Sequence, residues 1–150
     1  MRLQRQVRTG ATVVECAIVY PATFLLVLGL IVGGLGIFRY QEMSSLARRA
    51  ARYASVHGTE YARTMRTTPP TPEQIYNEAI KPYAISLDPN RLTYTVTYDR
   101  ENAPATPDIK AGDVVLRGNT VKVTVSYFWV PEAFLGGVTL SSTSVMPMSY

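Results

Sequence analysis

Residues 11–38 read ATVVECAIVYPATFLLVLGLIVGGLGIF, and this stretch decides the fold. It holds one charged side chain, that of Glu15, and the next charge along the chain is Arg39. A helix of about 20 apolar residues crosses the hydrocarbon core of a bilayer, whereas the apolar part of a secretory signal has only about 7–15 residues. The stretch therefore predicts a retained transmembrane helix over residues 11–38, preceded by a short basic segment, residues 1–10.

A helical pattern continues beyond the apolar stretch to about Met65. Small and apolar side chains recur there at steps of three and four residues, which places them on one helix face. This face consists of Ile37, Tyr40, Met43 or Ser44, Ala47, Ala50, Ala51, Ala54, His57 and Tyr61. We expect residues 39–66 to extend the helix and to pack this face on a partner, with an interruption at His57–Gly58 as an alternative.

Four arginines fall on the other faces of this extension: Arg48, Arg49, Arg52 and Arg63. A solvated helix face is the simpler interpretation of the arginine run at residues 48–52. Contact of this run with anionic lipid headgroups, worth about 1 kcal/mol per basic residue, is the alternative.

The C-terminal part, residues 67–150, reads as a small α+β domain. Prolines in residues 67–72, TTPPTP, end the long helix, and a short helix begins at Thr71 or Pro72. Three stretches alternate apolar and polar side chains with the period of a strand: residues 91–99, 119–130 and 137–148. Residues 113–116 could add a short strand, and residues 100–112, rich in proline and polar residues, predict a loop.

These patterns predict the fold class. Strands with one apolar face form antiparallel sheets that are covered on one side. The apolar face of the long helix is the obvious cover. We expect an α+β fold in which a long N-terminal helix, transmembrane in its first half, packs on a small antiparallel sheet.

Charge and cysteine content narrow the function classes. The formal net charge is +4, and basic residues flank the apolar stretch on both sides. The short leader favours a cytoplasmic N-terminus. The one cysteine, Cys16, excludes an intramolecular disulfide. A basic patch with base-stacking aromatics in a nucleic-acid module is missing, so no nucleic-acid partner is expected.

Nothing in the sequence indicates catalysis, a metal site or a cofactor. His57 is the only histidine, and we interpret it as a packed or surface residue of the helix. Asp108 and Asp113 match no calcium-loop spacing and read as solvated loop carboxylates. Cys16 reads as a small apolar residue of the membrane helix, with lipid attachment or redox chemistry as the alternatives.

Two features of the apolar stretch ask for an explanation. A carboxylate deep in a bilayer costs about 2.5–3.5 kcal/mol on insertion scales, so Glu15 is a candidate functional residue. The alternative is a boundary charge at the head of a plain anchor. Gly29 and Gly33 form a G-x-x-x-G pair that would suit close helix packing, although membrane helices are generally rich in small residues.

The string RTGATVVECAIVYPATFLLVLGL, residues 8–30, resembles the TadE-like family of minor pseudopilins of tight-adherence (Flp-type) pili. The short basic leader, the glycine and the carboxylate at the fifth position of the apolar helix are the pattern of type IV pilin precursors. The segment LARRAARYAS also fits that family, as does a C-terminal end with a valine-rich strand, a proline-containing turn and a serine- and threonine-rich strand. One departure is Cys16, where Flp-type pilins often have an aromatic residue.

The resemblance implies a role for each of these residues. Cleavage would follow Gly10, Ala11 would become the mature N-terminus, and Glu15 would pair with the new amine within one helix or between subunits during assembly. It also implies a pilin-like fold and a bacterial inner-membrane location with the C-terminal domain outside. The implied partners are a prepilin peptidase, other pilins and an inner-membrane assembly platform with its ATPase, besides membrane lipid.

Two other functions remain open. The chain could be an unprocessed single-pass membrane protein whose external domain binds a ligand or partner. It could also be an enzyme, but no nucleophile–base arrangement or metal-ligand spacing supports that function. The residue at the mature N-terminus, Ala11 or Met1, distinguishes the first two possibilities.

Overall fold

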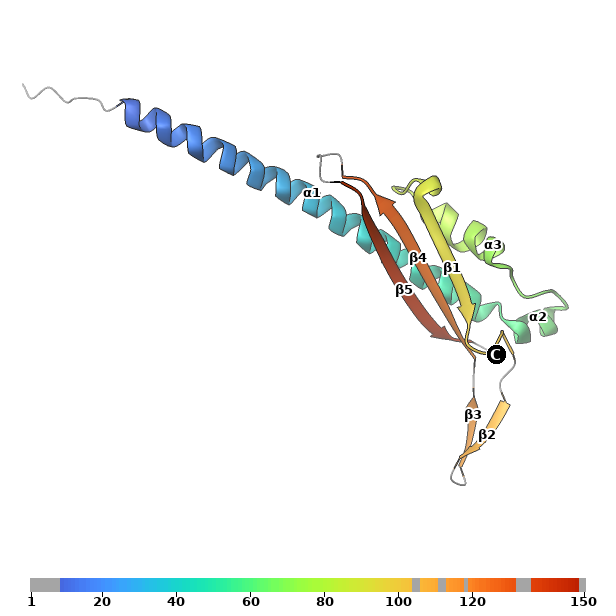
Figure 1. Cartoon of the computed structure of the whole chain (residues 1–150). Helices are drawn as coiled ribbons and strands as arrows, with labels where there is room; N and C mark the ends of the chain where they lie inside the picture. The colour runs from blue at the N-terminus through green and yellow to red at the C-terminus, as the bar shows by residue number, and fades with distance from the viewer. Residues whose placement is uncertain (1–8, 104–105, 111–112, 118, 132–135, 149–150) are drawn as a thin grey trace, which may run out of the picture. The chain divides into compact units, whose positions relative to one another are not determined.

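The structure is a computed structural model that describes residues 9–103, 106–110, 113–117, 119–131 and 136–148. Its first element is helix α1, Thr9–Val56, which runs through Pro21 without ending (Figure 1). By internal packing the chain divides into residues 1–36 and residues 37–150. The predicted long helix is therefore present, followed by a small antiparallel sheet in the second unit.

The long helix ends earlier than its pattern suggested. After α1 the chain turns at Gly58 and starts a short helix α2, Thr59–Met65, so the alternative with an interruption at His57–Gly58 is confirmed. A Cβ at Gly58 would overlap the terminal methyl group of Met148, so a larger residue at this turn would require the flexible Met148 side chain to move.

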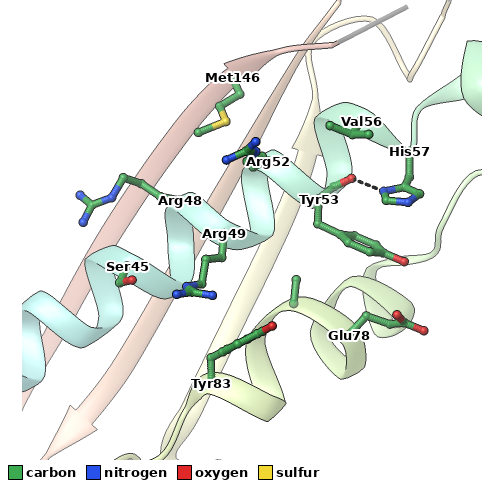
Figure 2. Close-up of a pocket in the computed structure, with 11 residues that line it drawn as sticks. Ser45, Arg48, Arg49, Arg52, Tyr53, Val56, His57, Glu78, Tyr83 and Met146 are labelled. Atoms are coloured by element: carbon green, nitrogen blue, oxygen red, sulfur yellow. Dashed lines mark hydrogen bonds between the residues drawn. The ribbon is translucent and has the colours of Figure 1, made fainter.

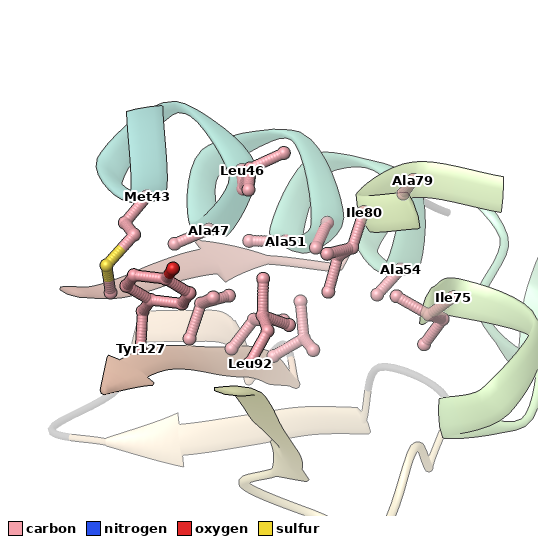
Figure 3. Packing of buried hydrophobic residues seen from close by; sticks show 14 of the residues in the cluster. Met43, Leu46, Ala47, Ala51, Ala54, Ile75, Ala79, Ile80, Leu92 and Tyr127 are labelled. Atoms are coloured by element: carbon pink, nitrogen blue, oxygen red, sulfur yellow. The ribbon is translucent and has the colours of Figure 1, made fainter. Parts of the chain in front are cut away.

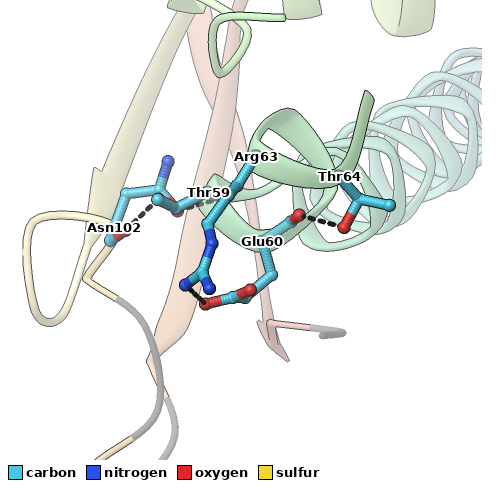
Figure 4. A network of polar contacts seen from close by, with 5 residues as sticks. All are labelled: Thr59, Glu60, Arg63, Thr64 and Asn102. Atoms are coloured by element: carbon cyan, nitrogen blue, oxygen red, sulfur yellow. Dashed lines mark hydrogen bonds and ion pairs between the residues drawn. The ribbon is translucent and has the colours of Figure 1, made fainter. Parts of the chain in front are cut away.

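Helix α2 is hydrogen-bonded to a loop that is distant in sequence, and it has an ion pair on its own surface (Figure 4). The backbone N–H of Thr59 donates to Oδ1 of Asn102 at 3.3 Å, and the Thr59 hydroxyl donates to the Asn102 carbonyl. Asn102 has a positive φ of 60°, which asparagine tolerates better than most residues. On α2 itself, Arg63 lies 3.7 Å from the Glu60 carboxylate. These contacts fix the turn that follows α1.

The main sheet has three antiparallel strands in the order β1-β4-β5. They are β1, Leu92–Tyr98, β4, Thr120–Trp129, and β5, Val138–Pro147. In register, Val96 pairs with Val123, and Val125 pairs with Ser142. Burial alternates along all three strands, most cleanly in β4. All three predicted strands are confirmed, and so are the apolar inward faces predicted for β1 and β4.

A second, two-stranded sheet corrects the loop prediction. Strand β2, Thr106–Lys110, pairs antiparallel with β3, Asp113–Arg117, so the expectation of a loop throughout residues 100–112 is wrong. The short strand expected at residues 113–116 is confirmed as β3. Each strand of an isolated hairpin is an edge, and an edge strand tolerates the proline at position 107. Proline and polar residues therefore did not distinguish this hairpin from a loop.

The second part of α1 packs on one face of the main sheet (Figure 3). Mostly small side chains of the helix meet a row of β4 valines. On the helix the buried residues are Met43, Leu46, Ala47, Ala50, Ala51 and Ala54, and on β4 they are Val121, Val123, Val125 and Tyr127. The predicted cover of the sheet is confirmed.

The packed stripe of the helix is shorter than predicted. Ile37 and Tyr40 are 63% and 49% exposed, so their assignment to the packed face is wrong. The buried stripe begins only at Met43, and Leu46, which the pattern omitted, belongs to it. The helix period places side chains on a face, but only the extent of the sheet decides how much of that face is covered.

A short helical segment completes the core. It starts as α3, Pro72–Ile75, and continues as a π-helical turn η1, Tyr76–Ile80, and a 3-10 turn η2, Lys81–Tyr83; a further turn, η3, covers Pro89–Arg91. The Thr71 side chain and the Gln74 side chain cap each other's backbone N–H groups, which fixes the predicted start. Ile75 and Ile80 are fully buried against the sheet.

Candidate functional site

The predicted processing position lies at the start of α1. Gly10 is the second residue of this helix, and a Cβ built on it would meet no atom within 4 Å. Its backbone is helical, so a positive φ does not require glycine there either. Within the described chain nothing in the packing calls for glycine at position 10.

Glu15 projects from the same helix into open space. Its side chain is exposed, and the two ion pairs of the described residues join other groups, Arg63 with Glu60 and Arg91 with Asp88. In the uncut chain α1 begins at Thr9, and its first turn holds no acidic residue. If the helix began at Ala11, Glu15 would lie close to its N-terminus, where the helix dipole favours negative charge.

The backbone nitrogen of Ala11 and the residue Glu15 lie one helical turn apart on α1. Residues four apart lie on one face of a helix and are separated by about 6 Å along its axis. A charged group at the nitrogen of Ala11 would therefore lie within reach of the Glu15 side chain. The helix therefore places the Ala11 nitrogen and the Glu15 carboxylate close together, whether or not the chain is cut.

The side chains around Glu15 on α1 are apolar and exposed. From Val13 to Phe38 large apolar side chains stand exposed, among them Ile18 and Leu30 at 69%. This helix is long and apolar enough to cross a membrane, with a peak mean hydropathy of 2.3 and none of that window buried. The surface needs an apolar environment, which lipid or neighbouring apolar helices supply.

The predicted helix-packing pair is equally open. Gly29 and Gly33 lie one turn apart on one face of α1, and a Cβ at either would meet nothing within 4 Å. The same is true of Gly34. In the single chain, therefore, these glycines accommodate no close neighbour.

His57 is a packed residue, as expected. Its ring stacks on Tyr53 with centroids 4.2 Å apart and meets Tyr61 edge-on at 4.8 Å. Burial and, to a lesser degree, the nearby Glu78 carboxylate raise the pKa of Tyr53 above its usual value. Among the residues that the structure describes, no three His, Cys, Asp or Glu side chains gather as metal ligands.

One group of residues was not identified from the sequence. Arg48, Arg49 and Arg52, interpreted above as a solvated face, line a groove together with Tyr83 and Met146 (Figure 2). The buried alanines of α1 form what we call the alanine stripe: Ala47, Ala50, Ala51 and Ala54. The position of the three arginines outside this stripe could be read from the sequence. Their partners in the groove come from distant segments, which periodicity along α1 could not reveal.

Comparison with known families agrees with the resemblance drawn from the sequence. Residues 10–52 match the family model described as TadE-like protein. The matched segment contains Gly10, Glu15, the apolar stretch and the arginine-rich turn of α1. No curated protein and no solved structure matches the chain. The family match and the apolar helix support a membrane protein associated with tight-adherence pili, a family of structural and accessory rather than enzymatic proteins.

Proposed function

We propose that this chain is a minor pseudopilin, a membrane-anchored prepilin that is cut after Gly10 and takes part in assembly or function of a tight-adherence pilus. The observation that carries the proposal is the family match over residues 10–52. It covers a glycine and a glutamate that have no role in the fold of the single chain. Their role then lies in processing and assembly.

The chemistry follows from the helix geometry. Cleavage of the bond after Gly10 leaves a charged α-amino group on Ala11, one helical turn from the Glu15 carboxylate. Each charge is costly in an apolar environment, and a partner of opposite sign offsets that cost. The partner is the amine of the same chain or that of a neighbouring subunit, and pairing between subunits would set their axial register.

Other parts of the chain have roles in this proposal. A prepilin peptidase supplies the catalytic groups, and its cleft receives the small, Cβ-free Gly10. Residues 1–10 are the leader, residues 11–38 the membrane helix, residues 39–66 its extension and residues 67–150 the domain outside. Gly29 and Gly33 provide the face on which another pilin helix packs. The N-terminus is cytoplasmic, and an inner-membrane platform takes up the processed subunit.

The experiment is intact-mass spectrometry with N-terminal sequencing of the chain from its native membrane. We expect a mature form that begins at Ala11 and is lost in Gly10→Leu. The matched control is Gly34→Leu, which introduces the same side chain at another open glycine of α1. It should leave cleavage intact.

A wild-type chain that begins only at Met1 would contradict the proposal. The chain would then be an unprocessed single-pass protein with an external binding domain. Loss of cleavage in both variants would indicate a general effect of leucine on the helix, and Gly10 would lose its assigned role.

A further inference from the structure

A groove on the domain of residues 37–150 lies over the solvent side of α1, opposite the alanine stripe. We call it the arginine groove and define it by Arg48, Arg49 and Arg52 of α1, Glu78 of η1, Tyr83 of η2 and Met146 of β5. Its volume is about 800 Å³ and it opens to solvent. The volume is large enough for several amino-acid side chains, not only for a single ion.

The groove carries a net positive charge, with three arginines and one carboxylate, that of Glu78, in its lining. Arg48, Arg49 and Arg52 are exposed, and none of them forms an ion pair with a carboxylate in the described part of the chain. Arg48 donates a hydrogen bond to the hydroxyl of Ser44 at 2.8 Å. This acceptor is neutral, so the hydrogen bond leaves the positive charge of Arg48 uncompensated. Three cations within two turns of one helix repel one another, and an anionic ligand would relieve that repulsion.

One of these guanidinium groups is already held in place. Arg49 extends toward Tyr83 and lies over its ring, 4.3 Å from the centroid (Figure 2). Stacking orders the side chain and leaves its N–H edge available in the plane, where a carboxylate binds in bidentate fashion. Arg49 therefore loses little further conformational entropy when a ligand binds.

Apolar surface accompanies the charge. Tyr83 is 47% exposed, Val56 beside the groove is 43% exposed, and Met146 contributes a half-buried thioether. Arginine, tyrosine and methionine together are the composition that protein–protein interfaces favour, whereas lysine is depleted there. The three cations of the arginine groove are all arginines.

We propose that the arginine groove docks an acidic segment of another polypeptide. Two carboxylates of that segment pair with the guanidinium groups of Arg48, Arg49 and Arg52. Separate apolar side chains of the segment pack on Tyr83 and on Met146, which lie on opposite sides of α1 (Figure 2). This function concerns a partner of the domain and does not depend on cleavage after Gly10.

Glu78 favours a polypeptide over a lipid surface. Its carboxylate lines the same groove as the arginines. An anionic membrane presents negative charge to the whole groove, and Glu78 would repel it. A polypeptide can offer carboxylates to the arginines and an amide or cation to Glu78, so mixed charge in the groove matches mixed charge in the ligand.

The test uses the full chain in an uncharged detergent and a fluorescein-labelled peptide that carries four glutamates and two leucines. Binding is followed by fluorescence anisotropy. We expect saturable binding that weakens about tenfold in the double variant Arg48→Gln/Arg52→Gln, a change of about 1.4 kcal/mol. A peptide with glutamine in place of glutamate should not bind.

The matched control is Arg91→Gln/Lys122→Gln, which removes the same charge from exposed positions outside the groove. It should change the dissociation constant less than about twofold, because distant exposed charges are screened by salt. Far-UV circular dichroism confirms that both double variants fold. A second groove variant, Tyr83→Ala, should weaken binding because it removes the ring on which Arg49 stacks.

Three results would overturn the proposal. Equal weakening in both double variants would mean attraction by net charge alone, and no saturable binding would mean that the groove holds no acidic segment. The third is displacement of the labelled peptide by glycerol 3-phosphate at a lower concentration than the unlabelled peptide requires. That result would assign the groove to phosphate headgroups.

Discussion

At the scale of the residue, Glu15 is the feature of the apolar helix that calls for a functional explanation. It is the one charged side chain of α1 between Thr9 and Phe38, and it stands exposed among exposed apolar neighbours. Replacing it by glutamine keeps the size and removes the charge. If Glu15 pairs with a subunit amine, Glu15→Gln should lower the incorporation of this chain into pili about tenfold, or about 1.4 kcal/mol of contact free energy.

The measurement is quantitative immunoblotting of sheared pili against the membrane fraction. Glu73→Gln is the control, since Glu73 is an exposed glutamate of α3 in the other unit. Undiminished incorporation of Glu15→Gln would contradict the pairing role. The carboxylate would then be a boundary charge of the membrane helix.

At the scale of the element, the contact between α1 and the sheet holds the domain together. Val123 is fully buried in β4 under the alanine stripe, whereas Val145 of the neighbouring β5 is 57% exposed. Val123→Ala removes two methyl groups and leaves a cavity, so we expect a loss of about 1–3 kcal/mol in the free energy of unfolding. Val145→Ala should cost less than about 0.5 kcal/mol.

Urea unfolding of the full chain in detergent, followed by fluorescence, measures both variants. Trp129, the only tryptophan, lies at the end of β4 and reports on this domain. Equal destabilisation by the two substitutions would show that the buried face of β4 is not the core of the domain.

At the scale of the whole molecule, the two units differ in their internal packing. Among the described residues, all buried core side chains lie between Met43 and Met148, so the described part of the first unit contributes none of them. A chain that starts at Ile37 should therefore fold on its own and stay soluble, because it lacks the apolar helix surface of the first unit. We expect a cooperative thermal transition by circular dichroism and no sedimentation with membranes.

The full chain, extracted only by detergent, is the control for that fragment. A fragment that melts without cooperativity would show that the membrane helix is needed to order the domain. A fragment that sediments with membranes would place a second membrane contact on the domain itself.

The sequence by itself determined the local elements. Each predicted element shows its own pattern of apolar side chains: the uninterrupted apolar stretch and the alanine stripe of α1, and the alternation along β1, β4 and β5. Such a pattern depends only on residues that are near one another in the chain. Glu15 was singled out as a charge in the apolar stretch, and Gly10 was singled out by the resemblance to pilin precursors.

Only the tertiary structure decided which of these faces are covered. The sheet leaves Ile37 and Tyr40 exposed, and the pairing of β2 with β3 turns an expected loop into a hairpin. Tyr83 and Met146 line one groove with the arginines of α1. These features depend on contacts between residues far apart in the chain. Such contacts follow from how elements end and pack in three dimensions, and periodicity within one element carries no information about them.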